Sequence, residues 1–236
     1  CHPSLPSRQR WLFVDGMKID GKPMRTIWAE KDAASVGIID QTQLPFRFVT
    51  LRLATLDEAV RAIKTMQVRG APLIGATAAY GVWLALLADA SDDNLERAYA
   101  ALLAARPTAI NLKWALDQMV AAVRNRPRAE RAAVALQRAN EIADEDVAIN
   151  RAIGRHGLKL IEDIAARKKG GRVNVLTHCN AGWLATVDWG TATAPVYRAH
   201  DSGRPGHVGV DETRPRNQGA GLTAWELLQR GAAHRV

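Results

Sequence analysis

Residues 174–182 read Asn174-Val175-Leu176-Thr177-His178-Cys179-Asn180-Ala181-Gly182. The apolar run at the start of this stretch predicts a β-strand that ends in polar residues, and Cys179 lies at that end. In open α/β sheets, ligands bind just beyond the carboxyl ends of the strands. Cys179 is therefore a candidate for chemistry, although a single cysteine can also be a small buried hydrophobic residue.

The sequence around this stretch alternates between strand and helix patterns. It predicts, in chain order, a strand over 172–176, a helix over 184–202, a strand over 207–210, a helix over 220–229 and the start of a third strand over 232–236. This alternation is typical of right-handed parallel βαβ units. We therefore expect residues 149–236 to form a Rossmann-like α/β domain. A sheet of so few parallel strands leaves an open edge, so we expect this domain to be truncated; the alternative is a short domain that ends in a tail.

Residues 1–148 predict an N-terminal α+β domain with a small β region followed by helices. A strand over 11–14 and turns at Asp15-Gly16 and Asp20-Gly21 come first, and strands over 36–39 and 46–53 follow. Helices are then expected over 56–67, from Pro72 onward, and over 92–105, 108–123, 127–147 and 149–169, the last two being split near Asp146. The predicted fold class of the whole chain is α/β, with an incomplete parallel-sheet domain after the α+β domain.

Composition and charge restrict the function classes. The 236 residues carry a formal net charge of +8, but the basic residues are scattered and lack interleaved aromatic residues. This distribution favours an anionic small substrate over nucleic acid. The longest apolar run, residues 72–90, contains Asp89 and predicts a buried helix, so we expect no membrane span. Only two cysteines are present, which excludes a disulfide framework and is typical of a cytoplasmic protein.

Two short segments of the N-terminal domain have the chemistry of phosphate sites. Arg69 and Gly70 stand before Ala71 and Pro72, where a helix is expected to begin. The free N–H groups of a helix start bind anions, Gly70 lets a ligand approach the backbone, and an arginine fork matches phosphate. The segment Arg106-Pro107-Thr108 repeats this pattern. Together they suggest a phosphorylated ligand, although each arginine could simply be solvated.

The loop after the second strand of the Rossmann-like domain is unusually polar. It contains two carboxylates, two arginines and an amide: Asp211-Glu212-Thr213-Arg214-Pro215-Arg216-Asn217-Gln218-Gly219. In a parallel sheet this loop shares an edge with Cys179. It is either part of a binding site or a loop whose side chains cap the next helix. His178 could activate Cys179, but neighbouring residues of a strand point to opposite faces. The other histidines lack metal-ligand spacing, so no metal site is expected.

With these motifs, the chain from about Met24 to its last residue resembles the methylthioribose-1-phosphate isomerases of methionine salvage. The motifs that carry the resemblance are 24–28 (Met-Arg-Thr-Ile-Trp), 68–72 (Val-Arg-Gly-Ala-Pro), 106–112 (Arg-Pro-Thr-Ala-Ile-Asn-Leu), 177–182 (Thr-His-Cys-Asn-Ala-Gly), 211–216 (Asp-Glu-Thr-Arg-Pro-Arg) and 218–220 (Gln-Gly-Ala). The wider family includes ribose-1,5-bisphosphate isomerases and regulatory subunits of a translation-initiation nucleotide-exchange factor, which are the alternative functions.

The resemblance implies an aldose–ketose isomerase that acts on 5-methylthioribose 1-phosphate, a phosphorylated pentose, without a cofactor and as a homodimer. It implies that Cys179 is catalytic and that the substrate is bound by Arg69, Gly70, Ala71, Arg106 and Gln218.

The chain also departs from the pattern of this family. Gly221 and Asn217 replace an arginine and an apolar residue that are usual there. The aspartate that serves the family as proton donor, and an Asn-Lys pair that binds substrate, belong to motifs downstream of Val236. Asp188, Asp201 and Asp211 do not lie in the matching motif. We therefore expect the 236-residue form to show little isomerase activity.

Overall fold

The computed structural model describes residues 16–169, 171–204 and 206–236, and its contacts cluster into two compact units. One unit is a continuous segment, Thr26–Asp146, and the other combines the chain up to Arg25 with Val147–Val236. Below they are called the N-terminal and the C-terminal unit. The division falls inside α6 (Arg128–Arg167), a single helix of 40 residues. The expected strand over 11–14 and the Asp15 turn position lie outside the described residues. The domain limits given above remain a prediction.

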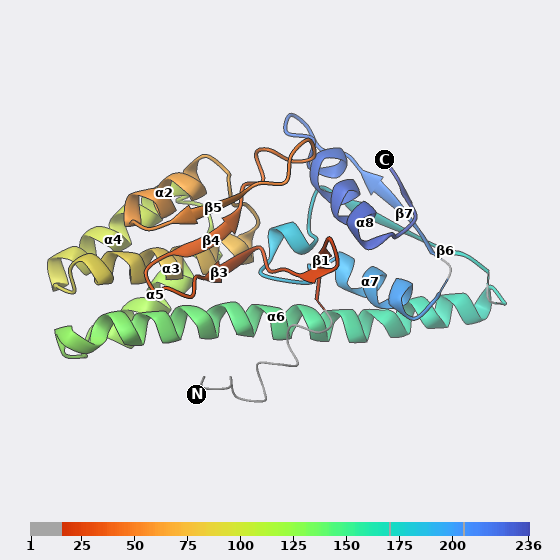
Figure 1. Cartoon of the computed structure of the whole chain (residues 1–236). Helices are drawn as coiled ribbons and strands as arrows, with labels where there is room; N and C mark the ends of the chain where they lie inside the picture. Colours follow the sequence, from red (N-terminus) through yellow and green to blue (C-terminus); the bar gives the residue numbers. More distant parts are fainter. Residues whose placement is uncertain (1–15, 170, 205) are drawn as a thin grey trace. The chain divides into compact units, whose positions relative to one another are not determined.

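The N-terminal unit packs helices beside a small antiparallel sheet (Figure 1). Its elements are β3 (Ile27–Ala29), β4 (Val36–Ile39), β5 (Thr50–Leu53), α2 (Leu56–Lys64), α3 (Ala71–Ala88), α4 (Asp92–Ala105), α5 (Ile110–Val123) and the first half of α6. The strand order is β3-β4-β5. Thr55 and Glu58 form a capping box that starts α2, and the Ser91 side chain caps α4. The starts of these two helices agree with the sequence-based expectation.

Helix α3 is the core of the N-terminal unit. By length and composition alone it could cross a membrane, but 78% of it is buried inside the protein. A helix that is hydrophobic on all sides is typical of such a core position. A Cβ atom at Gly75 would lie 3.0 Å from the Asn111 carbonyl oxygen, so this glycine allows α3 and α5 to approach closely.

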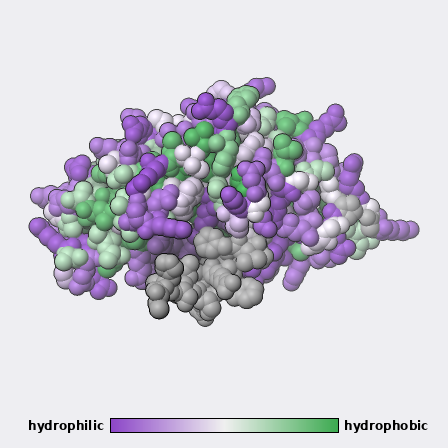
Figure 2. Space-filling view, viewed as in Figure 1, coloured by the Kyte–Doolittle hydropathy of each residue, from purple (hydrophilic) through white to green (hydrophobic). Residues whose placement is uncertain are grey.

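The C-terminal unit is built on a parallel sheet in the order β6-β7-β8. Its elements are β1 (Lys18–Ile19), β2 (Lys22–Pro23), β6 (Val173–His178), a 3₁₀ turn (Trp183–Ala185), α7 (Thr193–Asp201), β7 (Gly206–Asp211), a π-helical turn (Gly219–Thr223), α8 (Ala224–Arg230) and β8 (His234–Arg235). The expected parallel α/β fold is thus confirmed, as is the hairpin turn at Asp20-Gly21, where both residues have positive φ. Figure 2 shows hydrophilic residues over much of one face of the molecule, with hydrophobic residues between them.

Two expectations about the helices differ most from the structure. The helix expected over 184–202 begins only at Thr193, because Thr186 and Asp188 bond the backbone of their own loop: Thr186 Oγ1 donates to the Asp188 carbonyl, and Asp188 Oδ1 accepts from Trp189 N. Such local bonds compete with a helix. The break expected near Asp146 is absent from α6, because strong helix formers continue across this position.

Candidate functional site

Cys179 lies immediately beyond β6, at the carboxyl edge of the parallel sheet. The last residues of β6 and β7, His178 and Asp211, are paired in register, and Cys179 N donates to the Asp211 carbonyl oxygen at 3.2 Å. Cys179 is a half-buried free thiol with φ +60°. A non-glycine residue in this left-handed region costs about 1 kcal/mol or more and persists where its surroundings fix it. The candidate catalytic residue is thus one of seven non-glycine residues with positive φ in the described part of the chain, and it lies at the sheet edge.

The polar loop between β7 and α8 lies at the same sheet edge and contains Gln218. The Glu212 carboxylate accepts from the backbone N–H groups of Thr213 (2.7 Å), Gly219 (2.8 Å) and Ala220 (2.9 Å). Burial acts to raise the pKa of Glu212, but these hydrogen bonds outweigh it and the pKa is lowered. Glu212 thus caps the turn that leads into α8. The Gln218 amide oxygen accepts from the Thr213 hydroxyl, which fixes the orientation of this amide within the loop.

His178 is paired with Asp211. Its Nδ1 lies 2.7 Å from Asp211 Oδ2, and both side chains are exposed. Adjacent positions on parallel strands bring the two side chains to one face of the sheet. Among the described contacts of His178, this carboxylate is its hydrogen-bond partner. The in-register pairing of β6 with β7 explains why His178 faces Asp211.

The proposed anion sites both lie in the N-terminal unit. Gly70 is the N-cap of α3 with φ +91°, a conformation that favours glycine, and it has no side chain with which to cap the helix. Ala71 and Pro72 begin α3, so the expected helix start is confirmed. Arg69 is half-buried directly before this N-terminus. The N–H groups of such a helix start are available to an anion.

Arg106 differs from the expected arrangement. It is the C-cap of α4, and α5 begins only at Ile110, with Ala109 as its N-cap. The two phosphate-type segments are therefore not built alike: Arg69 adjoins a helix start, whereas Arg106 ends one helix and is separated from the next by a short turn. Arg106 is half-buried. The binding roles of Arg69, Gly70, Ala71, Arg106 and Gln218, and the catalytic role of Cys179, remain predictions.

Glu226 was not selected in the sequence analysis, yet its side chain, on α8, binds the segment that follows Cys179. It is fully buried and accepts hydrogen bonds from residues 180–184 and from Tyr197. Burial raises the pKa of Glu226, and those hydrogen bonds oppose this shift. The sequence does contain one indication of this role. Glu226 lies one helical turn after the buried Leu222, at a position where an apolar residue is expected.

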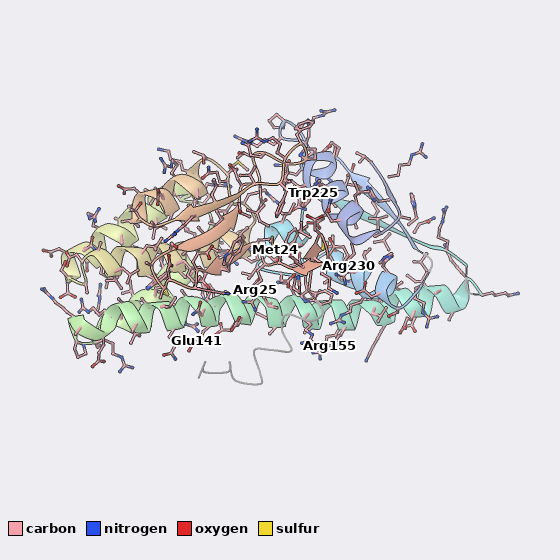
Figure 3. The ribbon with its side chains drawn as sticks, in the orientation of Figure 1. Met24, Arg25, Glu141, Arg155, Trp225 and Arg230 are labelled. Atoms are coloured by element: carbon pink, nitrogen blue, oxygen red, sulfur yellow. The ribbon has the colours of Figure 1, made fainter. Side chains whose placement is uncertain are left out.

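Asp188 is a buried residue whose hydrogen bonds stabilise the fold. It is 3% exposed, and its Oδ1 accepts from Met17 N at 3.1 Å and from Trp189 N at 2.8 Å. Burial raises its pKa to about 6, opposed by the two hydrogen bonds and by the charges of Arg25 and Arg230, which are labelled in Figure 3. This carboxyl group joins the segment before β1 to the loop before α7. The described residues contain no group of three or more His, Cys, Asp or Glu that could hold a metal ion.

The raised pKa of Asp188 makes the stability of the C-terminal unit depend on pH. Because the folded-state pKa of about 6 exceeds the ordinary value of 3.8, the folded chain holds an extra proton between these values. The contribution of Asp188 to the free energy of unfolding is therefore greatest below about pH 4 and is lost as the pH rises from about 4 through 6, a change of up to about 3 kcal/mol for this group. We expect Asp188→Asn to remove this loss, since Oδ1 still accepts both hydrogen bonds.

Urea unfolding at several pH values between 4 and 7 measures this difference. The exposed Asp163 provides a control, because Asp163→Asn should retain the pH dependence of the parent. The raised pKa of Glu226 acts in the same direction and remains in both variants. An Asp188→Asn protein whose stability falls with pH as steeply as that of the parent would contradict the assignment.

Comparisons with known proteins agree with the motifs. Residues 67–236 match the model of the Initiation factor 2 subunit family. The chain is 64% identical to a methylthioribose-1-phosphate isomerase of Methylorubrum populi and 63% identical to one of Paramagnetospirillum magneticum, in each case over 93% of this chain and 60% of the relative. The chain therefore spans about 60% of the length of these curated relatives.

Two solved structures have a similar fold. One is the 5-methylthioribose 1-phosphate isomerase of Pyrococcus horikoshii, with a TM-score of 0.79 and 37% identity over 93% of this chain and 60% of that chain. The other is the delta subunit of the translation initiation factor eIF-2B of A. fulgidus, with a TM-score of 0.77 and 36% identity over 89% of this chain and 61% of that chain. The resemblance deduced from the motifs is confirmed, and the chain belongs to the Initiation factor 2 subunit family.

Proposed function

We propose that the protein carrying this chain is an aldose–ketose isomerase that converts 5-methylthioribose 1-phosphate to 5-methylthioribulose 1-phosphate in methionine salvage. The observation that carries the proposal is the 64% identity, over 93% of this chain, to a protein named methylthioribose-1-phosphate isomerase. We further propose that it acts in the cytoplasm as a homodimer and uses no cofactor, nucleic acid or membrane.

The chemistry of the reaction fits the residues at the two candidate sites. Isomerisation moves hydrogen between neighbouring carbons, so one group must remove or guide a proton, another must return it, and the developing oxyanion needs donors. In the proposal, Cys179 takes part in this transfer and the Gln218 amide holds a substrate hydroxyl. The start of α3, with Arg69, Gly70 and Ala71, and the Arg106 guanidinium bind the phosphate.

Incubation with 5-methylthioribose 1-phosphate tests the proposal. We expect the protein produced from the complete gene to form the ketose phosphate, which NMR spectroscopy detects through the loss of the anomeric proton signal and the appearance of a ketone carbon. The 236-residue chain is assayed in parallel. Ribose 1,5-bisphosphate is the control substrate, and preferential turnover of it would identify the related bisphosphate isomerase instead.

A second candidate function is a non-catalytic regulatory subunit of a translation-initiation nucleotide-exchange factor. The observation that favours it is the similarity to the eIF-2B delta subunit of A. fulgidus, at a TM-score of 0.77. The lower identity of 36% makes it the weaker candidate. Absence of turnover with both sugar phosphates, together with incorporation into a larger protein complex, would favour this subunit over the enzyme.

A further inference from the structure

The strained backbone of Cys179 is held by hydrogen bonds on both sides. Cys179 N donates to the Asp211 carbonyl, and the Cys179 carbonyl accepts from Thr223 Oγ1 at 2.6 Å. The first bond belongs to the sheet edge and the second comes from the turn that enters α8. Since a left-handed cysteine relaxes when its surroundings release it, these two contacts fix the direction of the residue.

Thr223 is itself held in place. It is fully buried, and its Oγ1 accepts from Asn180 Nδ2 at 3.1 Å while it donates to the Cys179 carbonyl. A hydroxyl has one donor, so the bond from Asn180 leaves the hydroxyl proton to Cys179. Thr223 ends the π-helical turn Gly219–Thr223, and such turns are frequent at functional sites.

Glu226, one turn of helix further on, fixes the residues that follow Cys179. Its Oε1 accepts from Trp183 N at 3.2 Å and Tyr197 Oη at 2.9 Å. Its Oε2 accepts from Leu184 N at 3.1 Å and Asn180 Nδ2 at 3.3 Å. A single buried carboxyl group therefore receives four hydrogen bonds, two of them from backbone N–H groups just after Cys179.

The packing around Glu226 fits this arrangement. A Cβ atom at position 182 would collide with the Glu226 carboxyl group, so Gly182 is required for the close approach. Trp225 of α8, labelled in Figure 3, stacks on Trp183 with ring centroids 6.4 Å apart. The segment after Cys179 is thus bound to α8 by polar contacts and by ring stacking.

A buried carboxyl group surrounded by hydrogen-bond donors is a costly way to fasten a loop, since apolar side chains of similar volume often stabilise a fold as well or better. The polar arrangement adds a fixed orientation of the backbone groups that Glu226 binds. Hydrogen bonds fix the angles of the backbone groups that they join, whereas apolar packing tolerates small shifts.

We infer that Thr223 and Glu226 are positioning residues for Cys179: from the start of α8, they hold its carbonyl and the residues after it, so that the thiol is presented at the sheet edge in a fixed direction. This inference rests on the proposed function only in its consequence for catalysis. The placement of the thiol itself can be measured without a substrate.

The test compares Thr223→Val with Thr223→Ser in the protein with Cys1→Ser, in which Cys179 is the remaining thiol of the chain. Valine keeps the shape of threonine and loses the hydroxyl, whereas serine keeps the hydroxyl. We expect the valine variant to react with iodoacetamide faster than the parent near neutral pH, by about threefold or more, because local opening exposes the released thiol. We expect the serine variant to behave as the parent does.

Kinetics of the protein produced from the complete gene, with 5-methylthioribose 1-phosphate as substrate, provide the second readout. We expect Thr223→Val to lower kcat by about tenfold or more with little change in KM, since misplacement of a reacting group affects the transition state. Thr77→Val is the matched control: Thr77 is equally buried and also donates to a backbone carbonyl, that of Leu73 at 2.7 Å, but it lies in the N-terminal unit. It should alter neither alkylation nor kcat.

The outcomes separate the two proposals. A folded Thr223→Val protein whose thiol reacts less than about threefold faster than the parent would overturn the positioning role. If that variant does not fold, Thr223→Ala, which is less bulky at the same position, undergoes the same alkylation test. A parent protein produced from the complete gene that shows no turnover, while its valine variant reacts faster with iodoacetamide and its serine variant does not, would reject the isomerase proposal and leave the positioning of Cys179 intact.

Discussion

In the protein produced from the complete gene, replacement of Cys179 by alanine should reduce turnover of 5-methylthioribose 1-phosphate by about 10³-fold, within the range lost when a group that transfers protons is removed. The thiol lies at the carboxyl edge of the parallel sheet, one residue beyond the His178–Asp211 pair. Because Cys179 is half-buried, the change should leave the melting temperature nearly unaffected. We therefore expect kcat to fall in a protein that remains folded, as measured by NMR assay and by circular dichroism.

Two further variants sharpen the Cys179 experiment. Cys179→Ser keeps the size of the side chain but replaces the thiol with a group that ionises far less readily, so it should recover little of the lost activity. Cys1→Ser changes the other cysteine of the chain and should turn over substrate as the parent does. Turnover by Cys179→Ala within about tenfold of the parent would exclude Cys179 from the chemical step.

Replacement of Glu226 by leucine should lower the free energy of unfolding of the C-terminal unit by about 4 kcal/mol or more. The change leaves four donors without their acceptor: the N–H groups of Trp183 and Leu184, the Asn180 amide and the Tyr197 hydroxyl. Each buried polar group that loses its partner costs about 1–3 kcal/mol, and relief from burying the carboxyl group offsets only part of the sum. Urea unfolding monitored by tryptophan fluorescence measures the loss.

Glu226→Gln is the matched control for this stability experiment. The two oxygens of Glu226 each accept two of the four bonds, and glutamine keeps one oxygen while its NH₂ group faces the other pair of donors. We therefore expect a loss of about half that of Glu226→Leu. The order of stability should be parent, glutamine, leucine; a leucine variant as stable as the parent would show that these bonds do not stabilise the unit.

Local sequence patterns predicted much of the fold. The strand over 36–39 and the helix over 92–105 have the expected limits. A short, fully buried run marks the strand, and a serine N-cap marks the start of the helix. The parallel pairing of β6 with β7 also followed from the strand–helix–strand order. This pairing places Cys179 beside the loop that contains Gln218, and both were selected from the sequence.

The remainder depends on contacts between residues far apart in the chain. The helix expected from residue 184 is replaced by a buried loop in which Trp189 and Gly190 have positive φ, a conformation that no local pattern indicated. Glu226 is surrounded by donors from residues 180–197, so its role becomes visible only when α8 is packed against that segment. Arg106 was expected at a helix start, but its position is decided by where α4 ends.

The hairpin of β1 and β2 has a consequence for how the chain folds during synthesis. It belongs to the same compact unit as residues after Val147, and its partners are distant: Met17 N binds Asp188, 171 residues later, and Arg230 Nη1 donates to the Gly16 carbonyl, 214 residues later. The unit from Thr26 to Asp146 is continuous, so it can fold as soon as it leaves the ribosome. Synthesis adds about 5–20 residues per second. The hairpin therefore lacks its partners until the residues after Val147 have been synthesised. Contacts of such high sequence separation also slow folding. We therefore expect the continuous unit to become resistant to protease first on the nascent chain, with docking of the hairpin among the last steps.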